Sequence, residues 1–348
     1  MKNRKKIIGN GIFLILVFAL TMYGVFHGED LGQIKDTIQR ANIWYLLPAV
    51  ICVVVFIWGE SVIIHYLMKI LQFKMKRWKC FLISSVGFFF SCITPSASGG
   101  QPMQMVYMKK EKIPLPISSL VLMIVTITYK MVLVLVGLFL LFFQHGFVKK
   151  YLHGIMPVFY LGIILNVVCV AVLLLLVFHP LLMKKIMTKG YGFLVKLHLM
   201  KNKPSRMKKL DDSMELYCET ASFFKSHIGV MIIVFLLTLF QRIILFMVTY
   251  FVYRSFGLAR YGIYDLTMLQ AVIAVAVDML PLPGGMGISE KLFSIIFAPV
   301  FGSVLLLPGM ILSRGLSYYT ELLVSAVMTM AAHLTLGRGR QSVQTKIQ

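Results

Sequence analysis

The chain has 348 residues, 59% of them hydrophobic, and a formal net charge of +22, with a mean hydropathy of +0.84. Soluble domains contain about 45–50% apolar residues, so this composition indicates an integral membrane protein and leaves little sequence for a soluble domain. The basic residues cluster at the ends of apolar segments, which is typical of cytoplasmic membrane flanks rather than of a nucleic-acid interface. We expect no nucleic-acid partner.

Apolar segments long enough to cross a bilayer, which requires about 20 residues, recur along the sequence. They cover residues 7–26, 43–68, 117–143, 155–183, 228–252 and 304–333. The first segment follows a basic N-terminus, lacks a small-residue cleavage site and is long for a signal peptide core. We therefore expect it to remain as an uncleaved first helix.

The charges between these segments predict their orientation. Segment 69–79 holds five basic residues and no acid, and segment 184–227 has ten basic residues against four acids. Both are expected in the cytoplasm, together with the two termini, whereas the net acidic segment 27–42 is expected outside. We expect one transmembrane domain over residues 1–337, with 184–227 as a basic cytoplasmic loop on the anionic leaflet and 338–348 as a cytoplasmic tail.

Two shorter apolar regions are interrupted by glycine, proline and small residues. TPSASGGQP at 94–102 breaks the region 80–108, and PLPGGMG at 281–287 breaks the region 264–302. The loop charges stay consistent only if each region returns to the side from which it starts, the first to the cytoplasm and the second to the outside. Irregular backbone at membrane depth must be buried in protein or line a watery cavity. Kinks within ordinary membrane helices are the alternative.

The predicted fold is therefore an all-α polytopic membrane protein. It has about six full spans and two re-entrant, broken-helix hairpins in inverted orientation, as in secondary transporters. A multi-pass protein of a bacterial-type plasma membrane is expected.

The two glycine pairs are candidate anion sites. A helix that starts directly after such a pair presents free N–H groups and the positive end of its dipole. The Gly99–Gly100 pair precedes Pro102, a favoured first helical residue, so a helix is expected from Met103. The Gly284–Gly285 pair precedes Ile288 in the same way. In a membrane, the expected anion is a lipid phosphate.

Several ionisable residues lie inside or near the ends of the apolar segments. They are Glu60, Lys130, Arg242, Asp278, Glu290, Arg314 and Glu321. A charge at the bilayer centre costs about 2.5–3.5 kcal/mol on insertion scales, so each is a functional candidate. The alternatives are structural pairing, for example of Arg242 with Asp278, or snorkelling toward an interface.

No metal or cofactor chemistry is indicated. The five cysteines show no C-x-x-C spacing, and the eight histidines form no H-E-x-x-H motif, so disulfide frameworks and zinc sites are not expected. A Walker loop and a D-x-D motif are also absent from the sequence. We expect no cofactor, no metal and no catalytic residues.

Three separated motifs carry a family resemblance: TPSASGGQPMQMVYMKKEKIP at 94–114, LPLPGGMGISE at 280–290 and SRGLSYYTELL at 313–323. In their order and spacing the chain resembles the transmembrane region of lysylphosphatidylglycerol synthetases, the flippase-like part of the multiple peptide resistance factor family. Many relatives have an acid after the first glycine pair and a basic residue three positions later. This chain has Gln101 and Gln104 there, which removes the basis for an ion pair at that turn and leaves the head group open.

The resemblance implies a membrane unit that moves aminoacylated phospholipid, of the lysyl-phosphatidylglycerol type, between leaflets and contributes to resistance against cationic antimicrobial peptides. Full-length members add a soluble aminoacyltransferase domain, for which this sequence leaves no room, so a flippase-only member is expected despite a family label of phosphatidylglycerol lysyltransferase.

The expected site residues serve two roles. The lipid phosphate is expected at Gly99, Gly100, Gln101, Gly284, Gly285 and Arg314. A cationic head group or a coupling proton is expected at Glu290, Glu60 and Asp278.

Other functions remain open at this point. One alternative is a membrane component of phosphatidylglycerol lysyltransferase. The others are a transporter of polyprenyl lipid or glycolipid, and a scaffold for envelope enzymes. The expected partners are membrane phospholipid, a separate aminoacyl-lipid synthase and further copies of the chain.

Overall fold

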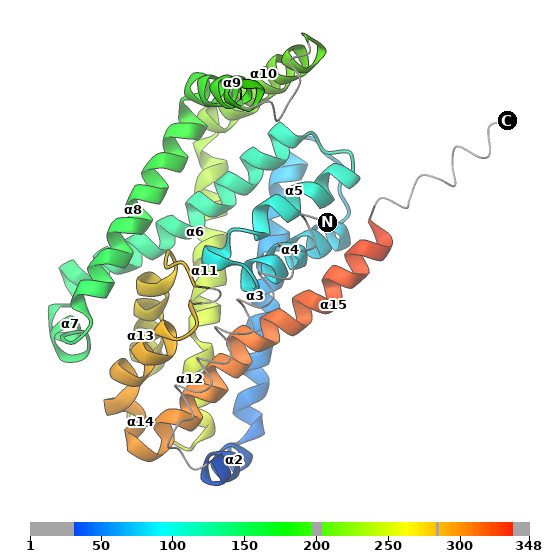
Figure 1. The fold of residues 1–348 in the computed structure, drawn as a ribbon. Coiled ribbons are helices and arrows are strands. Elements are labelled where there is room, and N and C mark those ends of the chain that lie inside the picture. The colour runs from blue at the N-terminus through cyan, green and yellow to red at the C-terminus, as the bar shows by residue number, and fades with distance from the viewer. Residues whose placement is uncertain (1–30, 197–203, 283–284, 337–348) are drawn as a thin grey trace.

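The computed structural model describes residues 31–196, 204–282 and 285–336, and the regular elements within these ranges are all helical. The first half of the chain forms α2 (Leu31–Gln39), α3 (Ile43–Ile70), α4 (Arg77–Cys92), η1 (Pro95–Ala97), α5 (Gly100–Lys110), α6 (Leu115–Phe143), α7 (His145–Tyr151) and α8 (Met156–Phe178). The second half forms α9 (Pro180–Lys196), α10 (Pro204–Ser226), α11 (Ile228–Phe246), α12 (Val248–Ser255), α13 (Ile263–Val277), α14 (Ile288–Arg314), η3 (Gly315–Tyr319) and α15 (Thr320–Thr335). Figure 1 shows them as one bundle.

Five helical runs are long and apolar enough to cross a membrane. They are Ile43–Ile70, Leu115–Phe143, Met156–Phe178, Ile228–Ser255 and Ile288–Thr335. These runs correspond to five of the six spans predicted from the sequence; the predicted span 7–26 lies outside the described residues. The protein is thus an all-helical, multi-pass membrane protein. The span predicted to reach residue 183 ends earlier, because a residue that precedes a proline, here Pro180, is disfavoured in a helix.

The last of these runs is broken about a third of the way along, within α14. Gly302 has a φ of 70° and a ψ of 172°, and this left-handed φ region is one that glycine adopts without steric cost. The chain turns at this residue. Residues 288–301 pack beside α13, and the rest of α14 continues through the π-helical turn η3 into α15, the long helix coloured orange to red in Figure 1.

α4, η1 and α5 form a first helical hairpin. At its base, Lys79 near the start of α4 forms an ion pair with Glu111, directly after α5. The turn at 93–99 lies at the other end. The prediction that the second helix starts at Met103 is wrong, because α5 begins at Gly100. Pro102 is tolerated there because N–H groups in the first helical turn have no intrahelical partner to lose.

α13 and residues 288–301 of α14 form a second helical hairpin. Its base is closed by the hydroxyl of Tyr261, which donates to the carbonyl of Pro299 at 3.3 Å. The turn at 278–287 lies at the opposite end, and positions 283 and 284 fall outside the described residues. In each hairpin, the start of the first helix and the end of the second therefore lie side by side.

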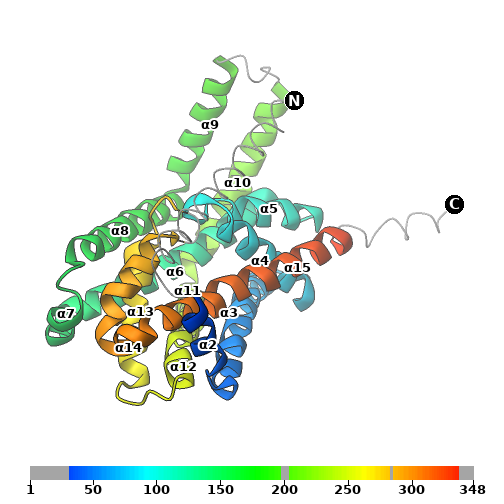
Figure 2. The same cartoon turned by 60° about the horizontal axis from the view of Figure 1, so that its bottom comes forward.

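The two hairpins start from opposite ends of the bundle. The first follows the C-terminal end of α3. The second follows α12, where the carbonyl of Ser255 accepts a hydrogen bond from the backbone N–H of Asn42, which precedes the start of α3, at 2.8 Å. Because α3 runs the length of the bundle, the two bases lie far apart and both turns point toward the middle (Figures 1 and 2). Figure 2 also shows α9 and α10 projecting from the bundle.

Each hairpin packs within its own apolar core, and α6 is shared by both. Residues of α6 up to Ile127 belong to the core around the first hairpin. Residues from Leu133 onward belong to the core around the second. Between these cores α6 carries the polar stretch Thr128–Lys130, which places polar side chains where the two hairpin turns converge.

Candidate functional site

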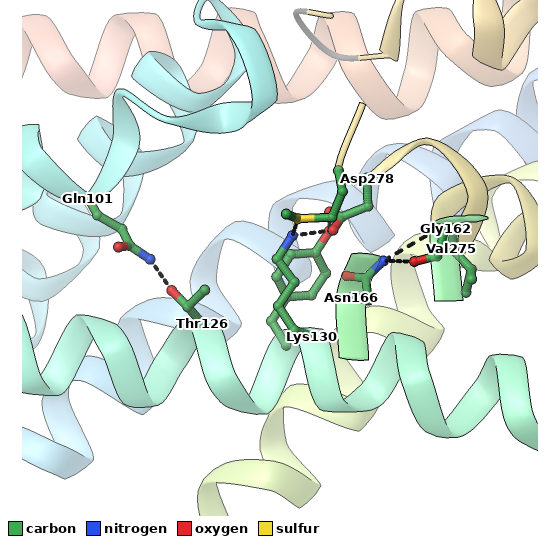
Figure 3. Close-up of polar contacts among 9 residues, drawn as sticks. Gln101, Thr126, Lys130, Gly162, Asn166, Val275 and Asp278 are labelled. Atoms are coloured by element: carbon green, nitrogen blue, oxygen red, sulfur yellow. Dashed lines mark hydrogen bonds and ion pairs between the residues drawn. The ribbon is translucent and has the colours of Figure 1, made fainter. Parts of the chain in front are cut away.

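Lys130 and Asp278 form the central ion pair of the molecule. The Lys130 ammonium and the hydroxyl of Tyr129 both donate to the carboxylate of Asp278, which directly follows α13. The two charged side chains are only 10% and 11% exposed. The ammonium also lies 3.0 Å from the sulfur of Met279. One buried carboxylate thus fixes the end of α13 against α6 (Figure 3).

A close contact between α8 and α13 holds Asp278 in this position. A Cβ atom at Gly162 would collide with the carbonyl oxygen of Val275, so only glycine lets the two backbones approach this closely. Asn166 donates to the carbonyl of Gly162 at 2.8 Å and to that of Val275 at 3.5 Å (Figure 3). The last turn of α13 is therefore anchored on α8.

Glu290 and Arg314 form a second ion pair at the start of α14. Glu290 accepts from the backbone N–H of Gly287 at 2.7 Å and from the Ser289 hydroxyl at 2.9 Å. The guanidinium Nε of Arg314 donates to the same carboxylate at 2.9 Å. Glu290 therefore caps the helix, as a carboxylate at a helix N-terminus does, and also joins the second hairpin to the last span.

The first hairpin makes neutral amide contacts instead. Gln104 donates to the carboxylate of Glu60 on α3 at 2.7 Å. Gln101 donates to the hydroxyl of Thr126 on α6, as Figure 3 shows. Gln101 and Gln104 therefore attach this hairpin to two spans without an ion pair.

Arg242 of α11 lies beside these contacts. Its guanidinium carbon is 3.6 Å from the ring centre of Tyr129 and 4.8 Å from that of Phe56. The pairing of Arg242 with Asp278 considered from the sequence is wrong, because Lys130 and Tyr129 occupy that carboxylate. Arg242 is not drawn outward to an interface either, since its Nε is buried.

The third sequence motif forms a π-helical turn directly after Arg314. Within η3, the hydroxyl of Tyr318 donates to the backbone carbonyl of Cys92 at 2.9 Å, and the Arg314 guanidinium lies 4.9 Å from the Tyr318 ring centre. Just after it, Glu321 accepts from the Cys92 thiol at 3.6 Å. π-turns often occur at functional sites. This one joins the last span to the end of α4.

Two of the predicted phosphate-binding glycines, Gly99 and Gly100, have packing roles in the structure. A Cβ atom at Gly100 would collide with the Ser91 hydroxyl of α4, and one at Gly99 would crowd Thr94, whose hydroxyl accepts from the Gly99 N–H at 2.9 Å. Gly285 has a φ of 66°. Gly284 lies outside the described residues. Phosphate binding at these positions stays a prediction.

The structure thus brings together five candidates that are dispersed in the sequence. Asp278, Lys130 and Arg242 lie around Tyr129, and Glu60 and Glu321 lie near Arg242. Tyr129 itself was not identified from the sequence. A possible signal was its place next to Lys130 in an otherwise apolar segment, because a buried tyrosine hydroxyl requires a hydrogen-bond partner. The pair Glu290–Arg314 lies alongside, joined to this group through Tyr318 and Glu321.

Comparison with known proteins agrees with the motif-based resemblance. Among curated proteins, none matches the chain. A family model described as the lysylphosphatidylglycerol synthase TM region matches residues 7–325. The match covers most of the chain and includes all three motifs. The chain therefore belongs to the lysylphosphatidylglycerol synthase transmembrane-region family.

Proposed function

We propose that this protein is a lipid transporter that moves an aminoacylated or other anionic phospholipid, of the lysyl-phosphatidylglycerol type, between leaflets. The observation that carries the proposal is the group of charged side chains buried among the spans, at the convergence of the two hairpin turns. Charges at membrane depth are costly and mark substrate or ion pathways. By this activity the protein contributes to resistance against cationic antimicrobial peptides.

In this proposal both hairpins are re-entrant and enter the membrane from opposite faces. Helix lengths support this view. α4 has 16 residues and α5 has 11, which at 1.5 Å per residue correspond to about 24 and about 16 Å. Neither crosses a hydrocarbon core of about 30 Å. The closed bases, Lys79–Glu111 and Tyr261–Pro299, support a return to the starting face.

The head group would cross at the meeting point of the turns while the acyl chains stay in the bilayer. The phosphate is proposed to rest near the start of α5, at Gly99, Gly100 and Gln101, and near the second glycine pair, Gly284 and Gly285, with Arg314 as charge partner. Glu290, Glu60 and Asp278 then face a cationic head group or carry a coupling proton. In that case, the ion pairs within the bundle exchange partners as the lipid passes.

A transport assay tests this function. The purified protein is reconstituted into liposomes that hold fluorescent lysyl-phosphatidylglycerol in one leaflet, with plain phosphatidylglycerol as control, and the lipid reaching the other leaflet is measured. We expect selective transfer that is lost in Glu290→Gln and in Arg314→Ala. Unchanged transfer in both variants, with correctly inserted protein, would reject these site residues. No transfer of either lipid would reject the transport proposal.

The family description favours one second candidate, a membrane component of lysylphosphatidylglycerol synthesis that works with a separate synthase. This role predicts that deleting the protein lowers the cellular amount of aminoacylated lipid. The transport role predicts an unchanged total amount with less of it in the outer leaflet. Measuring both quantities in one strain separates the two.

A further inference from the structure

Arg242 is a buried cation whose hydrogen-bonding capacity is not used within the described part of the chain. Its Nε is buried and has no hydrogen-bond partner there. Its guanidinium lies against the faces of Tyr129 and Phe56 at 3.6 and 4.8 Å. With rings against its faces, a guanidinium offers an anion the N–H donors at its edge, and here these are the donors of the two terminal nitrogens, since Nε is buried.

The two other cations of the group already have carboxylate partners. Lys130 pairs with Asp278, and Arg314 pairs with Glu290. The remaining carboxylates are Glu60 and Glu321, and both interact electrostatically with Arg242 without forming an ion pair with it. Their hydrogen bonds come from other groups, the Gln104 amide and the Cys92 thiol.

We propose that Arg242 is a further residue that binds the phosphate of the transported lipid, in addition to the positions proposed above. This inference rests on the proposed transport function. A planar guanidinium matches two phosphate oxygens at once, which is why arginine recurs at phosphate sites. Arg314 is less suited to the task, because an incoming phosphate would first have to displace the carboxylate of Glu290.

The charges around Arg242 also assign the class of lipid. Of the three cations in this group, Lys130 and Arg314 are already paired with carboxylates, so the single positive charge of Arg242 is left for a ligand, with Glu60 and Glu321 nearby. An anion at Arg242 therefore faces Glu60 and Glu321, and each further negative charge is repelled. A phosphodiester carries one negative charge, whereas a phosphomonoester carries about −1.5 to −2 at pH 7. The site selects phosphodiester lipids over phosphatidic acid or polyprenyl phosphate.

Lipid binding to the full-length protein in detergent tests this assignment. Native mass spectrometry measures the binding of phosphatidylglycerol and of phosphatidic acid with the same acyl chains, and inorganic phosphate and glycerophosphoglycerol serve as probes without acyl chains. We expect phosphatidylglycerol to bind at least about tenfold more tightly than phosphatidic acid, and Arg242→Gln to weaken it about tenfold, the effect of losing a hydrogen bond to a charged group. Arg242→Lys should retain part of the affinity.

A matched control exists on the same helical run. Arg254 lies over the Tyr45 ring at 5.6 Å, at the end of α12 and away from the buried charges, so Arg254→Gln should bind phosphatidylglycerol as the unchanged protein does. The double variant Glu60→Gln/Glu321→Gln removes the repulsion and should raise the affinity for phosphatidic acid about tenfold. This gain of binding cannot result from misfolding.

Three results would overturn the inference. They are unchanged phosphatidylglycerol binding in Arg242→Gln, equal affinities of the unchanged protein for the two lipids, and binding of inorganic phosphate as tight as that of phosphatidylglycerol. The transport assay separates this inference from the proposed function. Lipid that binds through Arg242 but never crosses liposomes would reject transport and retain the site. Lipid that crosses equally well in Arg242→Gln would reject the site and retain transport.

Discussion

The two helical hairpins reach the middle of the bundle with different chemistry. The α4–α5 hairpin is attached through the neutral amides of Gln101 and Gln104. The α13–α14 hairpin is attached through carboxylates, Asp278 and Glu290, each paired with a cation. Removing one member of a buried ion pair leaves a buried charge without its partner, whereas a hydrogen bond between two neutral groups, such as that of Gln101 with Thr126, contributes little net stability. Substitutions at the polar contacts of the second hairpin should therefore cost more stability than those of the first, and the first three substitutions below test this difference, with a fourth at the projecting helices as an exposed reference.

The largest effect is expected from Asp278→Asn. The change leaves the Lys130 ammonium buried without its carboxylate, and we expect it to lower the free energy of unfolding by about 3–5 kcal/mol. Thermal unfolding of the purified protein in detergent measures this loss. The double variant Lys130→Met/Asp278→Leu removes both charges and should recover most of the stability. A double variant no more stable than the single one would show that the ion pair is not the cause.

A smaller loss is expected from Glu290→Gln, since this carboxylate both caps α14 and binds Arg314. We expect the free energy of unfolding to fall by about 1.5–3 kcal/mol, as on losing hydrogen bonds to a charged group. Asp265→Asn is the matched control, because Asp265 accepts from the Gly262 N–H at 3.4 Å at the start of α13 as a capping acid. It should cost about 0.3–1 kcal/mol. Equal losses would mean that Glu290 acts only as a cap.

On the first hairpin, Gln101→Met keeps the side-chain length but removes the hydrogen bond to Thr126. We expect a loss of about 0.5–1.5 kcal/mol, the net value of a neutral hydrogen bond. The same unfolding measurement applies, with Thr126→Val as the reciprocal change. A loss as large as that of Asp278→Asn would contradict the difference between the two hairpins.

The smallest effect is expected at the projecting helices. Lys184 and Asp211 form an ion pair at 3.1 Å between α9 and α10, with side chains 46% and 51% exposed. Water and salt screen such a pair, so Lys184→Gln should change stability by about 0–1 kcal/mol. A loss comparable with that of Asp278→Asn would mean that exposure does not set the value of ion pairs in this protein.

Much of this organisation follows from local sequence properties. Runs of apolar residues predict the spans, and the glycine- and proline-rich segments 94–102 and 281–287 predict the two turns, because both depend on neighbouring residues only. The pairing of the buried charges could not be predicted from local sequence. Whether Asp278 contacts Lys130 or Arg242 depends on the packing of α13 against α6 and α8, which is determined by long-range contacts such as that of Gly162 with Val275. The π-helical turn around Tyr318 could not be predicted either, because it also depends on a long-range contact, that of Tyr318 with Cys92.

The most direct test of the account is the side of the membrane on which each hairpin base lies. In a background with the five cysteines replaced, single cysteines are placed at Lys76 and Lys112, which flank the first hairpin, and at Gly262 and Ser303, which flank the second. A membrane-impermeant thiol reagent is then applied to intact and to permeabilised cells. We expect labelling of positions 262 and 303 in intact cells, and of 76 and 112 only after permeabilisation. If the two flanks of either hairpin label from opposite sides, that hairpin crosses the membrane and the account is contradicted.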